Sequence, residues 1–256
     1  MKESWHARRI EEAEEFWKRE RLDPAAAFHT VRCTEISDSK RLRLEVDVAV
    51  EERIALFLDG VKVADLFCLP SQLEELAVGH LVCEGHLGGI EDLVSARVDG
   101  KEIVCEGRSK VIKREARPTV SDLRISPEAV FRAFDEINEG ALLWRRTGGT
   151  HSALVVGEDG AIRSFCEDVS RSSAVDKAVG SALMGGADPS RSALITTGRL
   201  SSAIVSKAAM AGVPVLVSRA GPLNSGIELA VRLGMTLAAF ARRPNLYVYA
   251  GEERLL

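Results

Sequence analysis

Hydrophobic and polar positions alternate along the first part of the chain. Residues 42–50 carry leucine or valine at every second position, and residues 54–58 repeat the pattern. A period of two is typical of a strand that buries one face. Asp59-Gly60 predicts a tight turn into a return strand. A second hairpin is expected over residues 94–105, with its turn at Asp99-Gly100.

A helix is predicted between these two hairpins. Pro70 ends the strand pattern, and Ser71 followed by Glu74 has the spacing of a capping box. His80 falls on the apolar face of this helix, which favours a core or interface histidine over a catalytic one. Cys83 stands beside a glutamate, and a neighbouring carboxylate raises the pKa of a thiol. We therefore expect Cys83 to be structural.

The second half of the chain changes character. Ser126-Pro127 predicts a helix start, with serine as the cap and proline in the first turn. From there on, short apolar strands alternate with helical segments, a pattern that favours a layered α/β domain with at least partly parallel strands. Strands are expected at 153–156, 162–165, 193–196, 213–217, 235–240 and 246–249, and helices at 174–183, 200–211 and 227–233.

Three regions are expected along the chain. Residues 1–24 form a charged helix, either a solvated extension or a partner-binding element. Residues 25–117 form a small β-rich domain with one helix, and residues 118–256 form the α/β domain. The stretch from 108 to 117 is locally basic. It is either a solvated linker or an arm that meets an anionic ligand or an acidic partner, and Pro118 marks the boundary after it.

Composition narrows the class of protein. The chain of 256 residues has a formal net charge of −4, which gives no overall signal for nucleic-acid binding. No apolar run reaches the roughly 18 residues of a membrane helix, and no signal-peptide core is present. Five scattered cysteines without a Cys-x-x-Cys pair argue against a disulfide framework and a structural zinc site. We expect a cytoplasmic protein with no membrane or nucleic-acid partner and no bound structural metal.

Two polar turns flank one predicted strand hairpin. The first is Thr147-Gly148-Gly149-Thr150-His151, where two adjacent glycines let the backbone turn sharply and approach a ligand. The second is Glu167-Asp168-Val169-Ser170-Arg171, where carboxylates can accept hydrogen bonds from a ligand or cap the following helix. Each turn alone is an ordinary surface turn. Together they open on the same edge of one sheet, so a binding site is the preferred interpretation.

Three further loops follow predicted strands. They are residues 196–199, 218–222 and 240–244, and each contains an arginine beside small or polar residues. In α/β sheets, ligands collect at the carboxyl ends of strands. Hydroxyl groups, backbone amides and cations at such positions suit an anion. The recurrence of strand, polar turn and arginine predicts an anionic-ligand site.

Several of these motifs together resemble one family. The matching stretches are residues 69–85, 147–151, 167–171 with 174–177, 197–201 and 236–242. In this order they are similar to the formate dehydrogenase accessory sulfurtransferases, the FdhD family. The resemblance implies a cytidine-deaminase-like three-layer α/β domain plus a smaller β-rich domain, that is, an α+β protein overall. The zinc signature of cytidine deaminases is absent, so deamination is not expected.

The resemblance also implies a task. Family members pass sulfur from a cysteine desulfurase to the bis-guanine-dinucleotide molybdenum cofactor, for formate dehydrogenase or a related molybdoenzyme, and act as homodimers. The cofactor is then a bound substrate with GDP-like ends. The residues expected to bind it are Thr147, Gly148, Gly149, His151, Asp168, Arg171, Asp176, Lys177, Thr197, Gly198, Arg199, Ser218, Phe240, Ala241, Arg242, Arg243, Pro244 and Asn245.

The chain departs from the family pattern at two places. The Cys-x-x-Cys loop that holds the family's persulfide corresponds to residues 111–122, which contain no cysteine. Ser170-Arg171-Ser172-Ser173 stands where the family reads Gly-Arg-His-Asn. Cys105 is the nearest thiol that could substitute, although no motif supports it.

Three interpretations therefore stay open. The first is a sulfurtransferase with an unconventional or missing sulfur carrier. The second is a non-catalytic chaperone that binds the molybdenum cofactor. The third is an α/β protein with an unrelated small ligand.

Overall fold

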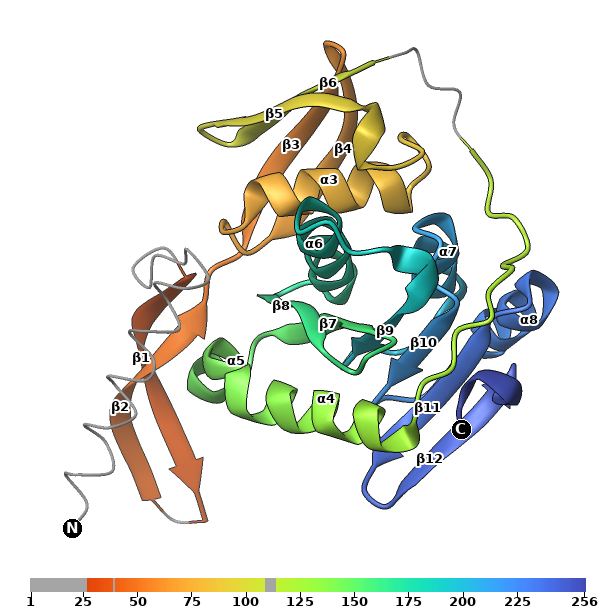
Figure 1. Cartoon of the computed structure of the whole chain (residues 1–256). Helices are drawn as coiled ribbons and strands as arrows, with labels where there is room; N and C mark the ends of the chain where they lie inside the picture. The colour runs from red at the N-terminus through yellow and green to blue at the C-terminus, as the bar shows by residue number, and fades with distance from the viewer. Residues whose placement is uncertain (1–26, 39, 109–113) are drawn as a thin grey trace.

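The computed structural model describes residues 27–38, 40–108 and 114–256. The charged helix expected over residues 1–24 and part of the basic stretch lie outside these ranges. The described chain contains a two-stranded ribbon, a four-stranded sheet and a six-stranded sheet (Figure 1). The limits of the three expected regions stay a prediction.

The ribbon consists of β1 (Phe28–Ser37) and β2 (Lys40–Ala49), which pair antiparallel along their whole length. Its base rests on α5 (Leu142–Thr147). There Arg146 forms an ion pair with Asp47 at 2.7 Å, and its guanidinium lies 3.7 Å from the centre of the Phe28 ring. The sequence pattern predicted β2 but not β1.

The four-stranded sheet has the order β4-β3-β6-β5. Its strands are β3 (Glu52–Leu58), β4 (Val61–Cys68), β5 (Leu93–Asp99) and β6 (Glu102–Gly107), and a short 3-10 turn, η1 (Ile90–Asp92), precedes β5. Both predicted hairpins are confirmed. Asp59 and Gly60 have positive φ values of 51° and 77°, as a two-residue hairpin turn requires. α3 (Leu73–Cys83) packs on one face of this sheet, whose inward residues, such as Leu56 and Ile103, are fully buried.

The capping box predicted for α3 is wrong. The cap residue is Gln72, which adopts the left-handed conformation (φ 50°, ψ 44°) and makes no side-chain cap. The helix thus starts one residue later than a Ser71 cap requires, so Glu74 occupies the second helical position instead of the third. The hydroxyl of Ser71 is buried and has no hydrogen-bond partner among the described residues.

The six-stranded sheet has the order β12-β11-β10-β9-β7-β8, and its three strands β9, β10 and β11 run parallel. The expectation of at least partly parallel strands is confirmed. The strands are β7 (His151–Gly157), β8 (Ile162–Asp168), β9 (Ser192–Thr196), β10 (Val215–Ser218), β11 (Thr236–Arg242) and β12 (Asn245–Ala250).

Helices cover both faces of this sheet (Figure 1). α4 (Pro127–Gly140) lies on one face, and α6 (Arg171–Met184), α7 (Ser202–Met210) and α8 (Asn224–Leu233) lie on the other. The predicted cap of α4 is confirmed, because Ser126 accepts a hydrogen bond from the amide of Ala129. Short 3-10 turns, η2 (Pro189–Arg191) and η3 (Glu252–Arg254), complete the order.

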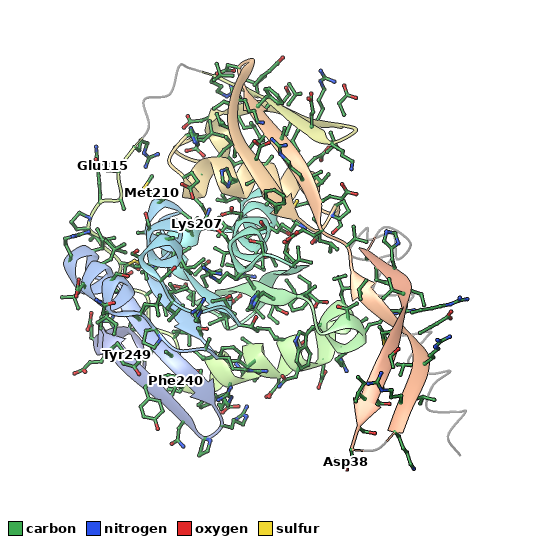
Figure 2. The ribbon with its side chains drawn as sticks, turned by 180° about the vertical axis from the view of Figure 1, so that it is seen from behind. Asp38, Glu115, Lys207, Met210, Phe240 and Tyr249 are labelled. Atoms are coloured by element: carbon green, nitrogen blue, oxygen red, sulfur yellow. The ribbon has the colours of Figure 1, made fainter. Side chains whose placement is uncertain are left out.

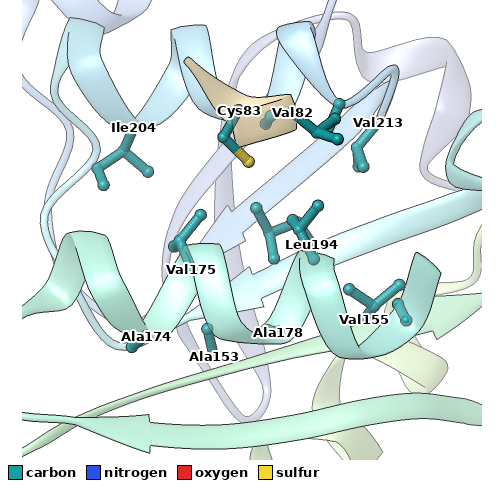
Figure 3. Close-up of a cluster of buried hydrophobic side chains, with 14 of the residues drawn as sticks. Val82, Cys83, Ala153, Val155, Ala174, Val175, Ala178, Leu194, Ile204 and Val213 are labelled. Carbon is teal, nitrogen blue, oxygen red and sulfur yellow. The ribbon is translucent and has the colours of Figure 1, made fainter. Parts of the chain in front are cut away.

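One hydrophobic core joins the two sheets. α6 lies between the large sheet and α3, and Figure 3 shows Val175 and Ala178 of α6, Leu194 of β9 and Val82 of α3 in one cluster of buried side chains. These four side chains are at most 2% exposed. The layers therefore follow in the order small sheet, α3, α6 and α7, large sheet, α4.

Candidate functional site

The two polar turns meet at one edge of the large sheet, as predicted. His151 opens β7 and pairs directly with Asp168, the last residue of β8. β7 also runs antiparallel to β9, with Ala153 opposite Thr196 at the end of that strand. The start of β7 and the ends of β8 and β9 therefore share this edge, next to the end of β10.

Glu167 holds the first turn, residues 147–151, in place. Its carboxylate accepts hydrogen bonds at 2.9 Å from the amides of Leu143 and Trp144, at the start of α5, and one at 2.8 Å from the hydroxyl of Thr150. Burial raises the pKa of Glu167, and these donors oppose the rise. At the other end of α5, Thr147 bonds back to the carbonyl of Leu143, and Gly148 ends the helix with a φ of 69°. Gly148 and Gly149 are exposed.

Asp168 and Lys177 face the protein interior. Both side chains have 0% exposure, and they form an ion pair at 2.6 Å. Asp168 also accepts the amide hydrogen of Leu69, while Lys177 donates to the carbonyl of the same residue. The pair therefore fastens α6 to the segment before α3. It does not present a surface to a ligand.

Asp176 lies in a second buried polar group between α3, α6 and α7. It binds the ammonium of Lys207 at 2.8 Å and Nδ1 of His80 at 3.0 Å, and Lys207 also contacts Glu84 at 2.8 Å. Burial acts to raise the pKa of Asp176, but Lys207 and His80 lower it. His80 is thus an interface histidine, as its position on the helix predicted. Asp176 is 1% exposed and holds helices together.

A positive group faces solvent at the same edge. Arg171 at the start of α6 and Arg199 between β9 and α7 are exposed, and no carboxylate of the described residues forms an ion pair with either. A Cβ on Gly198 would lie 2.9 Å from Cβ of Arg171, so the absence of a side chain at Gly198 allows this close approach. We call Arg171, Gly198, Arg199 and the neighbouring His151 the Arg171–Arg199 group.

His151 is half buried within this group. Its Nδ1 atom lies 3.4 Å from the hydroxyl of Thr197. Partial burial and the charges of Arg171 and Arg199 lower the pKa of His151 from its ordinary 6.5, against a smaller opposite effect of Asp168. The imidazole is therefore neutral at pH 7 and can form hydrogen bonds to an anion held by the arginines.

Hydroxyl groups hold the loop between β9 and α7 in place. Thr197 accepts the amide hydrogen of Ser152 at 3.0 Å, and the amide of Gly198 donates to Thr196 at 3.2 Å. Ser218, with 0% exposure, donates at 2.6 Å to the carbonyl of Gly198. Ser218 thus positions the loop from within and does not face a ligand.

The third predicted loop, residues 240–244, is for the most part strand. Phe240, Ala241 and Arg242 belong to β11, and the chain returns through Arg243-Pro244 into β12 as a hairpin. The sequence favoured a loop because Arg243 and Pro244 interrupt the apolar pattern. It did not show that β12 would pair antiparallel with β11. Ala241 is buried, whereas Phe240, Arg242, Arg243, Pro244 and Asn245 are exposed.

Arg243 is already neutralised. It binds the carboxylate of Glu128 at 2.8 Å and that of Asp135 at 3.2 Å, and these contacts raise the pKa of Arg243. Arg242 has no carboxylate partner in the described part of the chain. The hairpin therefore offers Arg242, rather than Arg243, to an anion.

Four of the five cysteines are shielded from solvent. Cys68, Cys83, Cys105 and Cys166 are buried, and Cys33 on β1 is exposed. Burial raises the pKa of Cys105 to about 11, with a smaller contribution from Asp59. A thiol with this pKa is protonated at pH 7, and at 0% exposure it is inaccessible. The geometry therefore disfavours Cys105 as a sulfur carrier.

Two residues at this edge of the large sheet were not among the expected site residues. Arg219, just after β10, bonds Asn138 of α4 at 2.8 Å. The loop containing Arg219 stood out in the sequence, but nothing there showed which face of the sheet its side chain would reach. Nothing in the sequence marked Asn138 as a site residue, because a polar residue near the end of an amphipathic helix is ordinary.

Comparisons with known proteins agree on one family. The model of the FdhD/NarQ family matches residues 49–115 and 99–256. A protein named sulfur carrier protein FdhD from Methanothermobacter thermautotrophicus is 34% identical over 239 residues, covering 86% of this chain and 95% of the relative. A protein of the same name from Wolinella succinogenes is 33% identical, with 86% and 87% coverage.

A solved structure has the same fold. It is described as that of a formate dehydrogenase accessory protein from Desulfotalea psychrophila, and it superimposes with a TM-score of 0.81 at 29% identity. The match covers 90% of this chain and all of the solved one. Among the described residues, no helix is both long and apolar enough to cross a membrane.

Proposed function

Because the chain belongs to the FdhD/NarQ family, we propose that it is an accessory protein of formate dehydrogenase or a related molybdoenzyme. In this proposal it binds the bis-guanine-dinucleotide molybdenum cofactor as a substrate and supports its sulfuration, with a cysteine desulfurase as the source of sulfur. The observation that carries the binding role is the Arg171–Arg199 group. There, two exposed arginines without carboxylate partners in the described chain stand beside a neutral histidine.

Each member of this group has a role in holding a nucleotide end. The guanidinium groups of Arg171 and Arg199 can each form paired hydrogen bonds to phosphate oxygens. His151 adds one hydrogen bond without adding charge. Gly198 lets the loop before Arg199 lie directly against the side chain of Arg171. When bound, the cofactor supplies the molybdenum that accepts the sulfur atom.

The sulfur-carrying role has weaker support in this chain. The relatives are named sulfur carriers, and such a role needs a thiol that a donor can reach. No Cys-x-x-Cys pair occurs in the sequence, and four of the five thiols are buried. This observation favours a second candidate function, a non-catalytic chaperone that holds the cofactor without carrying its sulfur.

Calorimetric titration with GDP tests the binding role, since GDP stands in for a nucleotide end of the cofactor. We expect binding to the unaltered protein, and a loss of affinity of about tenfold or more in both Arg171→Ala and Arg199→Ala, as for the removal of a charge-assisted hydrogen bond. Arg163→Ala is the matched control, because Arg163 is an exposed arginine near the opposite end of β8, paired with Asp159. Unchanged affinity in both site variants would rule out the Arg171–Arg199 group.

A sulfur-loading experiment separates the two candidate functions. The protein is incubated with a cysteine desulfurase and cysteine, and persulfide is then located by mass spectrometry. In the transfer, a thiolate of this chain attacks the outer sulfur of the enzyme's persulfide, a new S–S bond forms, and the donor leaves as a thiolate. Persulfide on Cys33 that disappears in Cys33→Ser supports the carrier. Absence of persulfide on every cysteine, with GDP binding retained, supports the chaperone.

A further inference from the structure

One face of the β1–β2 ribbon is apolar, and the described chain leaves it uncovered. In the antiparallel register, Leu44 stands opposite Cys33 and Val46 opposite Val31, so these side chains share a face. Of this face, Val31 and Val48 are each 39% exposed and Leu42 is 59% exposed. We call the following residues the apolar ribbon face: Val31, Cys33, Leu42, Leu44, Val46 and Val48.

The opposite face of the ribbon is charged and meets the body of the protein. It carries Arg32 and Glu45, which form an ion pair at 3.2 Å. At the base of the ribbon, Asp47 on this charged face pairs with Arg146 of α5. The apolar ribbon face is therefore turned away from α5. The rest of the ribbon extends away from both sheets (Figure 1), and Figure 2 shows Asp38 at its tip.

The apolar ribbon face needs a cover. Its residues on β2 alternate with polar ones, which is the pattern of a strand with one buried face. None of its side chains belongs to a hydrophobic cluster of the described residues. An isolated two-stranded ribbon is at best marginally stable in water, and packing against a helix stabilises it.

A suitable helix is encoded directly before β1. Residues 1–26 lie outside the described ranges, and their sequence is amphipathic between residues 10 and 17. At about 100° per residue, the four apolar residues of this stretch fall within about 120° of the helix circumference. They are Ile10, Ala13, Phe16 and Trp17. The other four residues are glutamates on the remaining side, and Trp5 adjoins the apolar side.

The dimensions of the helix and the ribbon agree. The ten residues of β1 span about 33 Å, and residues 5–22 span about 27 Å as a helix. Asp23-Pro24 ends the helical pattern, so residues 24–26 link the helix to Ala27. Three residues reach at most about 10 Å. A link this short gives an effective concentration in the millimolar range. It therefore favours this segment over a second copy of the chain or another protein.

We propose that residues 5–22 form a helix that packs along the apolar ribbon face and runs antiparallel to β1. The short link sets the register. Ala13 lies about 16 Å along the helix from Pro24, and Cys33 lies about 17 Å along β1 from Phe28, so Ala13 and Cys33 stand opposite each other. Cys33 is the exposed one of the five cysteines. In this arrangement a thiol reagent or a sulfur donor reaches Cys33 only when the helix moves away from the ribbon.

Crosslinking in the full chain tests the register. Ala13→Cys places a second thiol opposite Cys33, and we expect a short bismaleimide to join the two, with the linked peptides identified by mass spectrometry. Glu11→Cys is the matched control, because Glu11 lies on the other side of the helix. Equal linking in the two variants, or no link in either, would overturn the proposal.

Coexpression of two chains identifies which chain covers the face. One chain carries Ala13→Cys together with Cys33→Ser, and the other keeps Cys33 and is otherwise unaltered. A link between these two chains forms only when the helix of one covers the ribbon of the other. We expect no such link. Its appearance would show that a second copy supplies the helix, and the proposal would be wrong.

The reaction rate of Cys33 gives an independent measurement. Phe16→Ser combined with Trp17→Ser removes the largest apolar side chains, and we expect Cys33 to react with iodoacetamide about tenfold faster than in the unaltered chain. A tenfold change corresponds to a helix that is docked about 90% of the time. Glu14→Ser combined with Glu15→Ser is the matched control and should not change the rate.

Cys33→Ser measures the background reaction of the buried thiols. If Cys33 of the unaltered chain reacts as fast as in the variant that lacks Phe16 and Trp17, the apolar ribbon face is open to another protein and the proposal is overturned. The result does not depend on nucleotide binding, so it stands or falls separately from the proposed function.

Discussion

Gly79 of α3 and Gly180 of α6 lie against each other where the two helices cross. A Cβ on Gly180 would lie 1.9 Å from the carbonyl oxygen of Glu75 and 2.7 Å from the amide nitrogen of Gly79. A Cβ on Gly79 would lie 1.7 Å from the carbonyl oxygen of Asp176. The two backbones are thus in direct contact, and any side chain at the crossing would force the helices apart. This crossing joins the small sheet to the large one.

Gly180→Ala tests the crossing. The added methyl group meets backbone atoms that cannot turn away, so we expect a loss of about 3 kcal/mol or more in the free energy of unfolding, measured with urea. Gly140→Ala is the control at the last residue of α4, where the Cβ would lie 3.4 Å from the Phe165 ring. There we expect a change within about 1 kcal/mol. Equal effects of the two substitutions would contradict the close crossing.

Lys207→Met tests the buried polar group. The substitution leaves the carboxylate of Asp176 buried without its cation, and such a loss costs about 3–5 kcal/mol of the free energy of unfolding. Adding Asp176→Asn removes the uncompensated charge, so the double variant should lose less than the sum of the single variants in thermal or urea unfolding. Lys62→Met is the exposed control, since Lys62 pairs with Asp65 at the surface and such pairs are worth about 1 kcal/mol or less. Additive losses would mean that the two residues act independently.

Gly198→Ala tests the Arg171–Arg199 group without removing a charge. The added Cβ would lie 2.9 Å from Cβ of Arg171 and displace that side chain. We expect calorimetric affinity for GDP to fall about tenfold, roughly the worth of a charge-assisted hydrogen bond. In an Arg171→Gly background, which removes that Cβ together with the charge, the same substitution should have little further effect. A full tenfold loss in both backgrounds would show that Gly198 acts by another route.

His151 predicts a pH dependence of binding. In the free protein, burial, Arg171 and Arg199 lower its pKa below 6.5, so the folded state holds fewer protons than an unperturbed histidine would. A bound phosphate adds negative charge and raises that pKa again, so binding takes up a proton, and affinity rises as the pH falls towards and below about 6.5. Calorimetry in buffers with different ionisation enthalpies measures the uptake. His151→Gln should remove the part of the pH dependence that exceeds the titration of the nucleotide itself, and an unchanged profile would exclude His151.

The lowered pKa of His151 also makes the stability of the ligand-free protein depend on pH. Because the pKa of His151 is lower in the folded state, the unfolded state binds more protons at mildly acidic pH. The contribution of His151 to the free energy of unfolding is thus fully present above the pKa of about 6.5 that this histidine has in the unfolded state. It is lost as the pH falls towards and through the lower pKa of the folded state. Ligand-free protein and ligand-bound protein should therefore respond to acid differently.

Much of the fold could be predicted from local patterns. The hairpins at Asp59-Gly60 and Asp99-Gly100 and the Ser126 cap rest on contacts between residues that are close in the sequence. The elements of the second half follow from the local spacing of its apolar residues. β1 was missed because β1 is almost entirely exposed and its hydrophobic residues do not alternate. The predicted start of α3 was wrong by one residue, because local spacing cannot fix the first helical residue to within one position.

The site was harder to predict than the fold. The two turns that flank one hairpin placed His151 and Arg171 at one edge of a sheet, and the strand-end rule placed Arg199 at the end of its strand. The structure brings the three residues together at that edge. It did not show that Asp168 and Lys177 point inward, because their common partner Leu69 is about a hundred residues away in the sequence. A buried ion pair and a ligand-binding pair have the same residue types, and only the tertiary arrangement separates them.

The two-stranded ribbon has a consequence for how the protein behaves when it is concentrated. Each strand pairs only with the other, so within the described chain both outer edges expose unbonded amides and carbonyls over ten residues. Leu42 and Val31 add exposed hydrophobic surface. Open edges of this kind template pairing between molecules, and charged residues such as Lys40 and Arg41 near the tip act against it. Neutralising those charges should make the ribbon a starting point for aggregation.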